Sequence, residues 1–407
     1  MKHPLKPHPA VINGLEPGPF HQRIAAANHQ QSWVNWMGFA SASVLDNVEF
    51  EYFAIRNQAT LFDISPMCKY EIVGPDAERV IDRLVTRNVT KLKPGRVAYA
   101  IWCDEDGNII DDGTVFRLAT NRFRLCSQEP QLTWLDDIAY GFDVRITDVS
   151  RQIAALSLQG PTSFAVLQAL GIKGVEVLKP FDVEEFSFKG IKAEISRTGF
   201  TGDLGYEIWT SPKSAFKLWD ALVDAGRESG IRPIGYEAVE MARIEAGFLL
   251  PGKEFISARK VLRTDRVRNP FELGLGWLVD FDKPHFNGKR ALQALATKPL
   301  RRKLVAIEIE HDKPANGALI YHRKKHEIGM VTSALWSPTC KRNIAFAWLD
   351  APHGDPVTMA RPGKSDLWVE IYLQRELVWQ RQMARCEIVE KPFFTHPRRT
   401  QTPPARF

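Results

Sequence analysis

The change of pattern near residue 298 constrains the fold of this chain most. Before it, from about residue 69, short apolar runs typical of strands alternate with segments of helical periodicity. This mixture predicts an α+β fold rather than a regular parallel βαβ repeat. After it, short segments of alternating polarity, separated by Gly, Pro and Asn, predict an all-β module, a small barrel. We therefore expect three units, at residues 1–150, 151–298 and 299–407.

Strands and helices follow a similar order in the first two units, although their sequences do not repeat. Helical periodicity predicts helices at residues 48–57, 76–84, 131–140, 161–170, 212–229 and 236–246. In the third unit, strands are predicted at residues 303–310, 317–322, 327–333, 342–349 and 367–373. The first 20 residues resemble an extended arm that wraps a neighbouring unit, and a helical stretch carrying Trp33 and Trp36 is expected after it.

Composition limits the class of protein. Of 407 residues, 44% are hydrophobic and 25% charged, which is typical of globular chains with more than one domain. The net charge is +6, but the 54 basic residues are interspersed with 48 acidic ones, so a nucleic-acid partner is not predicted. The five cysteines lack the spacing of a disulfide framework or a zinc site. Without a signal peptide or a membrane-spanning run, we expect a cytoplasmic protein that needs no metal; its oligomeric state is not defined.

A hairpin at residues 97–118 carries the leading candidate for catalysis. Asp106-Gly107 lies between two apolar runs, and this dipeptide is favoured in two-residue hairpin turns. Counting back from that turn makes Tyr99 and Asp112 diagonal neighbours on one face, about 7–8 Å apart. A ring beside a carboxylate suits a heterocyclic amine, so Asp112 is the predicted catalytic residue. The alternative is that Asp111 and Asp112 only begin a turn or bulge.

A glycine-spaced segment follows a predicted strand in the second unit. Gly199, Gly202 and Gly205 occur at every third position, which would let the backbone approach a bound ligand closely. The spacing matches neither a dinucleotide-binding nor a Walker pattern. Glu207, just after the last glycine, could accept two parallel N–H bonds such as those offered by the edge of a reduced pterin.

The helix predicted at 236–246 brings charge and an aromatic ring toward the same region. Glu240 and Arg243 lie one turn apart, and Phe248 follows the expected C-cap at Gly247. An intrahelical ion pair on a solvated face explains Glu240 and Arg243 equally well.

Many motifs occur together and in order between about residues 50 and 395. They read RNQATLFDIS, GPDA, KPGRVAY, EDGNIIDDGTVFRL, SLQGP, SRTGFTGDLGYEIW, ARIEAG, NPFELGLGW, FNGKRAL and KPFF. In this set and order they resemble the aminomethyltransferase family of glycine cleavage T-proteins.

The resemblance implies a three-domain cloverleaf with tetrahydrofolate in a central channel. It implies that Asp112 is the catalytic aspartate, with Tyr99 beside it and Glu207 holding the pterin. The further cofactor residues that it implies are Phe181, Phe248, and Arg398 or Arg399 near the glutamyl tail.

The chain departs from the family pattern where the one-carbon donor is expected. Residues 63–68 read Asp-Ile-Ser-Pro-Met-Cys in place of Asp-Val-Ser-His-Met-Gly, and residues 125–127 read Leu-Cys-Ser in place of Val-Asn-Ala. The family's Ala-Arg-Asp becomes Ala238-Val239-Glu240, so an arginine often placed at the folate is missing, and Arg243 is a possible substitute. These changes favour demethylation of a small methylated amine, sulfonium or methoxy-aromatic over an aminomethyl group on a lipoyl arm.

Candidate residues on the substrate side are Trp36, Met67, Tyr70 and Ser127. An aromatic entrance of Trp33, Trp36, Phe39 and Trp102 would suit a methyl cation or an aromatic ring, although core packing explains these rings equally well.

Several other functions are considered. An aminomethyltransferase of glycine cleavage is the first alternative. A non-catalytic folate-binding protein is the second, but residues 249–255 lack the cysteine of its signature. A nucleic-acid binder based on basic clusters in the third unit lacks a recognisable module. His322 and His326 flank a Lys-rich turn with no third ligand and predict a solvated hairpin rather than a metal pair.

Overall fold

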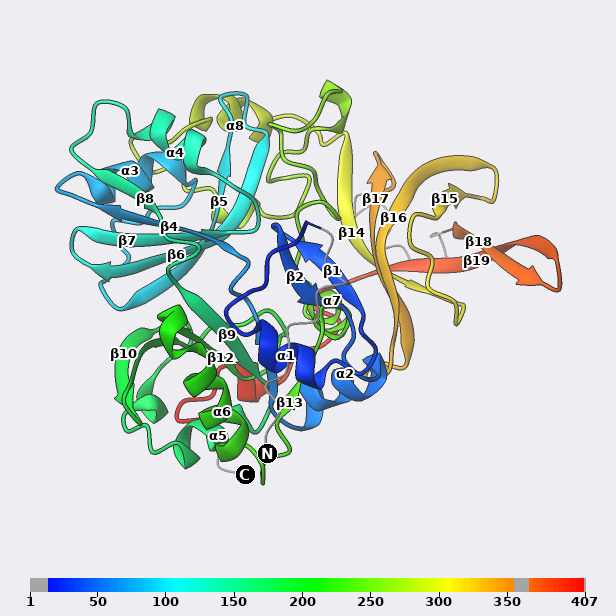
Figure 1. The fold of residues 1–407 in the computed structure, drawn as a ribbon. Coiled ribbons are helices and arrows are strands. Elements are labelled where there is room, and N and C mark those ends of the chain that lie inside the picture. The colour runs from blue at the N-terminus through cyan, green and yellow to red at the C-terminus, as the bar shows by residue number, and fades with distance from the viewer. Residues whose placement is uncertain (1–13, 355–365, 406–407) are drawn as a thin grey trace.

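The structure, a computed structural model, describes residues 14–354 and 366–405. Three lobes surround a common centre (Figure 1): two contain an open sheet with helices, and the third is a closed barrel. The central elements are α1 (His21–Ala27), β1 (Trp33–Trp36), β2 (Phe39–Ala42), α2 (Val48–Asn57) and α7 (Tyr236–Glu245). This architecture confirms the predicted α+β cloverleaf with a C-terminal barrel. Across the described ranges, no helix has the length and apolar character needed to cross a membrane.

The first lobe contains an antiparallel sheet in the order β5-β6-β7-β4-β8. Its strands are β4 (Cys68–Val73), β5 (Arg96–Cys103), β6 (Ile109–Ala119), β7 (Arg122–Ser127) and β8 (Arg145–Asp148). On the outer face, α3 (Ala77–Leu84) and α4 (Leu132–Ala139) bury apolar residues with Trp102 and Phe123. The helix α8 (Lys289–Ala296) packs at the tip of the β5–β6 hairpin. The inner face of this sheet is turned toward the centre of the molecule.

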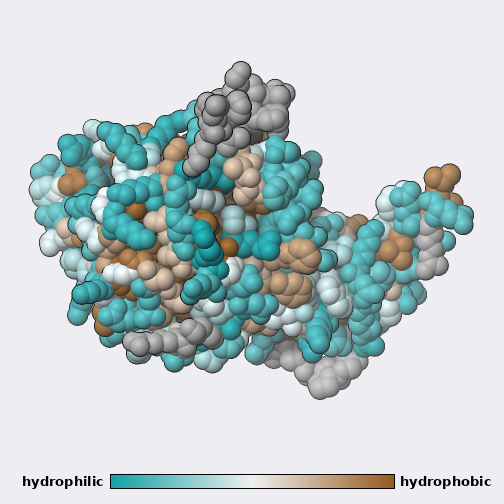
Figure 2. Space-filling view, turned by 60° about the horizontal axis from the view of Figure 1, so that its bottom comes forward, coloured by the Kyte–Doolittle hydropathy of each residue, from teal (hydrophilic) through white to brown (hydrophobic). Residues whose placement is uncertain are grey.

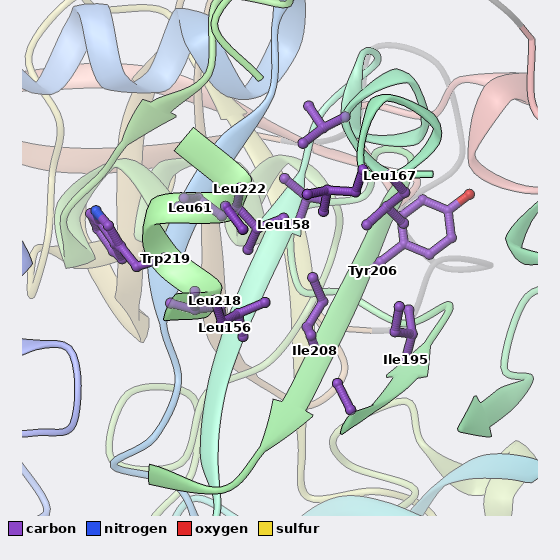
Figure 3. Packing of buried hydrophobic residues seen from close by; sticks show 14 of the residues in the cluster. Leu61, Leu156, Leu158, Leu167, Ile195, Tyr206, Ile208, Leu218, Trp219 and Leu222 are labelled. Carbon is purple, nitrogen blue, oxygen red and sulfur yellow. The ribbon is translucent and has the colours of Figure 1, made fainter. Parts of the chain in front are cut away.

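The second lobe contains a sheet in the order β10-β11-β12-β9-β3-β13. Its strands are β3 (Thr60–Asp63), β9 (Ala154–Gln159), β10 (Val183–Phe188), β11 (Ile191–Ser196), β12 (Gly205–Thr210) and β13 (Arg232–Pro233). The helices α5 (Ser163–Ala169) and α6 (Ala215–Ala225) cover one face. Figure 3 shows Leu156 and Leu158 of β9 beside Leu218 and Leu222 of α6. Because β3 precedes the first sheet in the chain, the segments that build the two lobes interleave.

The third lobe is the closed barrel β14-β17-β16-β15-β18-β19. Its strands are β14 (Arg302–Ile309), β15 (Leu319–His322), β16 (His326–Ser337), β17 (Arg342–Asp350), β18 (Leu367–Arg375) and β19 (Val378–Val389). The predicted segments match β14 to β18, and β19 was not predicted. His322 pairs with His326 across the β15–β16 hairpin. The β18–β19 hairpin projects from the molecule and has hydrophobic residues at its tip, among them Leu377 (Figure 2).

The six helices predicted from periodicity are present as α2 to α7, with ends set by local contacts, whereas α8 was not predicted. At the start of α2, the Asn47 side chain accepts hydrogen bonds from Glu49 N and Phe50 N. α7 ends just before Gly247, whose φ of +78° is the left-handed conformation expected after a helix. Within the described residues, short 3₁₀ turns occur at Val175–Val177, Pro212–Ser214, Thr264–Arg266, Gly276–Leu278 and Pro397–Arg399.

The helical stretch predicted around the first two tryptophans is wrong beyond residue 27. The helix α1 ends at Ala27, and Trp33 and Trp36 lie instead on the strand β1, where Trp36 pairs with Phe39 of β2. Pairing with β2 and packing of the rings against buried clusters outweigh the weak helical pattern. The predicted arm falls mostly on residues 1–13, which lie outside the described residues.

Candidate active site

Tyr99 and Asp112 meet on the inner face of the first-lobe sheet. In the β5–β6 pairing, Ile101 lies opposite Asp112 and Tyr99 opposite Thr114, so Tyr99 and Asp112 are diagonal neighbours as predicted. The Tyr99 hydroxyl donates a 2.6 Å hydrogen bond to Asp112 Oδ2. Burial and the Asp112 charge raise the pKa of Tyr99 well above its usual value, so the hydroxyl remains protonated and acts as the hydrogen-bond donor.

The turn of this hairpin differs from the prediction. Instead of a two-residue turn at Asp106-Gly107, Gly107 N donates to Asp104 O, and the turn is centred on residues 105 and 106. The Asp104 carboxylate accepts from the backbone of Asp106 and of Asn108, which stabilises the longer loop. A bulge between Trp102 and Cys103 then restores the expected register.

Asp112 is a buried carboxyl with a pKa close to neutrality. Its side chain is 8% exposed, and burial raises its pKa to about 6, opposed by the hydrogen bond from Tyr99. The neighbouring Asp111 is directed to the outer side, where Gln131 Nε2 and Glu129 N donate to its carboxylate. The two aspartates therefore have different roles: Asp111 is satisfied within the fold, and Asp112 remains on the inner face.

The predicted substrate-side residues are divided between the two faces of this sheet. Tyr70 and Ser127 lie on the outer face, where Tyr70 accepts from Gln131 N and Ser127 donates to Glu129 O. Trp102 is also fully buried there, so it is not part of an entrance. Tyr70 and Ser127 are thus separated from Asp112 by the sheet itself, because alternate residues of a strand point to opposite faces.

Trp36 and Met67 lie on the inner side, in the central apolar cluster between the lobes. The Trp36 ring stacks on Phe62 at 5.6 Å and meets Tyr236 edge-on at 6.2 Å. Met241 of α7 packs against this cluster and against the neighbouring cluster that also borders Tyr99. The structure therefore brings Trp36 and Met67 to the same central region as the hairpin.

Glu207 comes from the facing sheet of the second lobe. It alternates with buried Tyr206 and Ile208 and shares a face with Trp209, whose ring meets Phe116 of the first sheet at 5.3 Å. An ion pair of 2.5 Å between Arg124 and Glu194 also joins the two faces. Thr114 lies two residues before Phe116, and Glu207 lies two residues before Trp209. Because every second residue of a strand shares a face, Glu207 faces β6, the strand that carries Asp112.

The Glu207 carboxylate is only partly engaged by the protein. Thr198 Oγ1 donates to its Oε2 at 2.5 Å, the Ser196 hydroxyl lies close enough to lower its pKa, and no close hydrogen bond reaches Oε1 among residues 14–354 and 366–405. Burial raises its pKa to about 7. This oxygen is therefore available to accept hydrogen bonds from a ligand.

The three glycines before Glu207 make room for protein side chains. A Cβ on Gly199 or Gly205 would lie 2.0 or 2.2 Å from Gln159 Oε1, and one on Gly202 would lie 2.6 Å from the Ala246 Cβ. Gln159 in turn accepts from Thr201 Oγ1. The close approach predicted for a ligand is therefore occupied by Gln159 and Ala246, which fix the loop that leads into β12.

Arg243 has no hydrogen-bond donor left for a ligand. Its five N–H donors reach Glu240 (twice), Glu254, Phe248 O and Ser333 Oγ, at 2.5–3.1 Å. The side chain is fully buried. Arg243 therefore joins α7 to the barrel strand β16 instead of facing the site.

Three further predicted residues, Arg398, Arg399 and Phe248, lie at the edge of the central region, beside the glycine-spaced loop. The guanidinium of Arg398 is paired with both oxygens of Asp203 at 2.6 and 2.7 Å, whereas that of Arg399 lies 5.2 Å from the Phe248 ring. Phe248 stacks on Phe200 of the glycine loop. In the described part of the chain no carboxylate pairs with Arg399, so it is the better candidate for an anionic group.

Phe181 borders the strand that carries Tyr99, because its carbonyl accepts from Val97 N. Its backbone has a φ of +66°, and its ring is 36% exposed. The structure thus places Phe181 near the hairpin, without a contact to Tyr99.

Two residues near Tyr99 were not assigned from the sequence. The Trp277 ring is 70% exposed and lies 6.5 Å from the Tyr99 ring, and Arg87 Nη1 donates to Tyr99 O at 2.6 Å. Trp277 ends the motif NPFELGLGW, which was the available signal. No group of three or more metal-ligating side chains occurs in the described ranges.

Two family models match the chain. The GCVT N-terminal domain matches residues 20–283, and the glycine cleavage T-protein C-terminal barrel domain matches residues 302–394. A crystal structure of the glycine cleavage system aminomethyltransferase T from Bartonella henselae superimposes with a TM-score of 0.78 at 25% identity, covering 93% of this chain and 98% of that one.

Similar sequences include aminomethyltransferases and a trimethylamine-oxide aldolase. The aminomethyltransferase of Halothermothrix orenii is 35% identical over 76% of this chain and 86% of its own length, and that of Bacillus subtilis is 33% identical over 89% and 94%. A trimethylamine-oxide aldolase of Ruegeria pomeroyi is 34% identical over 85% of this chain but only 44% of its own length.

Proposed function

The chain belongs to the glycine cleavage T-protein family and is a transferase, and from this premise we propose that it moves a methyl group from a small methylated compound to N5 of tetrahydrofolate. The observation that carries the proposal is the hydrogen-bonded pair Tyr99–Asp112 on one sheet face, opposite the half-free carboxylate of Glu207 on the other. Burying carboxyl groups without a full set of partners is costly to a fold, so these two together indicate a functional site.

A reduced pterin fits the chemistry of these residues. The free Oε1 of Glu207 and its hydroxyl-bonded Oε2 can accept the N–H pair of a pterin edge. Reduced folate supplies a nucleophilic secondary amine at N5. At the edge of the central region, Arg399 is an unpaired cation over Phe248, which suits a glutamyl carboxylate, and the exposed Trp277 ring offers a stacking surface near Tyr99.

Asp112 is assigned the proton-transfer step. Its carboxylate, held by Tyr99, orients N5–H and takes up the proton when the N5–carbon bond forms. The bond between the methyl carbon and the heteroatom of the methyl donor breaks, and its electron pair stays with the heteroatom. Arg243 contributes by positioning α7 and the barrel, because all of its donors are engaged.

Two observations favour a small methylated compound as the source of the carbon. The turn at residues 63–68 departs from the family pattern, and Met67 at its end packs in the central cluster beside Trp36. A relative that covers 85% of the chain is named for trimethylamine oxide. Aminomethyl transfer in glycine cleavage is the alternative, favoured by the names of the other relatives; a non-catalytic folate-binding role is a third.

A panel assay tests this proposal. The protein is incubated with tetrahydrofolate and, separately, with methylated amines, sulfonium compounds, methoxy-aromatics and an aminomethyl-lipoyl carrier, and the folate product is weighed by mass spectrometry. We expect 5-methyl-tetrahydrofolate with a member of the small-molecule set. Product with the lipoyl carrier alone restores the glycine-cleavage function, and folate binding without any product supports the non-catalytic role.

A further inference from the structure

The indole N–H of Trp36 has no hydrogen-bond acceptor, although its side chain is 92% buried. Trp36 is 8% exposed, and Nε1 lacks a partner among the residues that the structure describes. Buried donors are almost always paired in native proteins, so an unpaired one in a functional region indicates an acceptor supplied by a ligand. The mechanism proposed above does not use this group.

The rings around Trp36 form an aromatic corner. Phe62 lies parallel to the Trp36 ring, with centroids 5.6 Å apart and 17° between the planes, and Tyr236 stands at 70° to it. Inserting a flat aromatic substrate between parallel rings requires about 7 Å, two contact spacings of roughly 3.5 Å, which the Trp36–Phe62 pair does not offer. A compact cation needs only ring surfaces and edges at an angle, as Trp36 and Tyr236 provide.

The charges of the central region agree with a cationic group. Asp112 and Glu207 form no ion pair among the described residues, and the cations nearby are engaged elsewhere. Arg243 pairs with Glu240 and Glu254, Arg124 pairs with Glu194, and the Lys69 ammonium donates to the carbonyls of Ser65 and Met67. A positive charge that enters the region therefore stabilises the ionised forms of Asp112 and Glu207. Met67 and Met241 complete the surroundings with polarizable thioethers, which suit methyl groups.

We infer that the Trp36 corner binds a methylated onium zwitterion: the methyl-bearing cation contacts the rings of Trp36 and Tyr236, and an anionic oxygen of the same molecule accepts the hydrogen bond from Trp36 Nε1. This inference rests on the proposed function and specifies its substrate class. Trp36 is then the residue that distinguishes a zwitterion from a bare onium ion of similar size.

The test compares two matched pairs of ligands, glycine betaine with tetramethylammonium and dimethylsulfonioacetate with trimethylsulfonium. Dissociation constants are measured by calorimetry on the wild-type protein, on Trp36→Phe and on Trp134→Phe. Trp134 also has a buried, unpaired indole N–H, but it packs on the outer side of the first lobe, so it is a matched control.

We expect the wild-type protein to bind each zwitterion about 10-fold or more tightly than the bare ion, in line with a hydrogen bond to a charged acceptor. Trp36→Phe should abolish this preference, and the melting temperatures of both variants are measured to confirm that they are folded, because each loses part of a packed indole ring; Trp134→Phe should keep the preference. Equal binding of zwitterion and bare ion by the wild-type protein, or tighter binding of 4-methoxybenzoate than of either zwitterion, overturns the inference. Zwitterion binding without any folate product contradicts the proposed function and leaves this site assignment standing.

Discussion

Asp112 and Tyr99 form a hydrogen-bonded pair whose protonation is set mainly by burial and adjusted by the contact between the two side chains. Tyr99, with its pKa raised well above the usual value, stays a hydrogen-bond donor, and Asp112, with its pKa raised to about 6, is mostly ionised at pH 7 but readily protonated. A carboxylate with this pKa can accept a proton from an amine and release it again near neutral pH. The pair is therefore suited to the proton transfer that accompanies bond formation at N5.

The pH dependence of the reaction follows from this pKa. Because the ionised form accepts the proton, kcat/KM for the methyl donor should fall about tenfold per pH unit below pH 6 and level off above it. The measurement is this kcat/KM from pH 4.5 to 8.5 with tetrahydrofolate saturating at every pH, so that folate binding does not contribute to the profile. An acidic limb with its inflection near pH 4, the value of an exposed aspartate, would contradict the assignment of Asp112 as the proton acceptor.

Glu207 predicts a different pH dependence, that of folate binding. Burial raises its pKa to about 7, so the carboxylate is protonated below pH 7 and accepts N–H bonds poorly there. The folate dissociation constant should therefore decrease as the pH rises from 6 to 8. Glu207→Gln should weaken binding about 10- to 100-fold at pH 8 and remove the pH dependence. Glu185→Gln, at a surface ion pair with Lys192 in the same lobe, is the control; equal effects of both variants would refute the role of Glu207.

At the scale of elements, the spacing of the glycines before β12 predicts a close contact but not the residue that makes it. The spacing of Gly199, Gly202 and Gly205 predicts close contact with the backbone, and the structure confirms close contact. It does not identify the partner, because Gln159 is distant in the sequence and reaches the loop only through the pairing of β9 with β12. The glycine spacing therefore predicts that another group lies close to the backbone, and only the tertiary structure identifies that group.

A double-mutant cycle tests this packing. Gly205→Ala places a methyl group 2.2 Å from Gln159 Oε1 and should lower the free energy of unfolding by about 1–3 kcal/mol. It should also weaken folate binding, because β12 carries Glu207. In the Gln159→Ala background the same change should cost markedly less, measured by chemical denaturation. Strict additivity of the two substitutions would show that Gln159 does not occupy this space.

The sequence predicted the register of the hairpin and six of the helices but missed the strands β1 and β19, and this difference has a physical reason. The register that places Tyr99 diagonal to Asp112 depends on residues close in sequence, and a bulge preserved it although the turn was wrong. The strands β1 and β19 gain their stability from pairing and packing with distant segments, so their own patterns were weak. Likewise, Arg243 resembled a free ligand-binding cation because Glu254 and Ser333 become its neighbours only in the folded chain.

At the scale of the whole molecule, buried charges connect α7 to α2 and to the barrel. Arg243 binds Glu254 and the barrel residue Ser333, and Glu245 binds Arg56 of α2 and Ser337 of the barrel. The inner faces of the two sheets pack against α7 in the central apolar cluster, and α7 is itself fixed to the barrel. Placement of Asp112 and Glu207 depends on this connection as much as on their own strands.

Arg243→Met tests the connection. Removing the cation leaves Glu240 and Glu254 without their partner in a buried region, which should cost about 3–5 kcal/mol. Arg342→Met, at the exposed pair with Glu308, should cost at most about 1 kcal/mol. Both are measured by denaturant unfolding at pH 7.5. Similar small losses in the two variants would contradict a role of Arg243 in joining α7 to the barrel.

The central claim, that Asp112 serves folate-dependent one-carbon transfer, is tested most directly by the folate product formed by Asp112→Asn. The variant keeps the shape of the side chain and an acceptor for the Tyr99 hydroxyl, so the fold and the folate dissociation constant should be retained. Formation of 5-methyl-tetrahydrofolate, followed by mass spectrometry with the methyl donor identified in the panel assay, should slow by about 100- to 10,000-fold. Turnover within a few-fold of the wild-type rate would contradict the account.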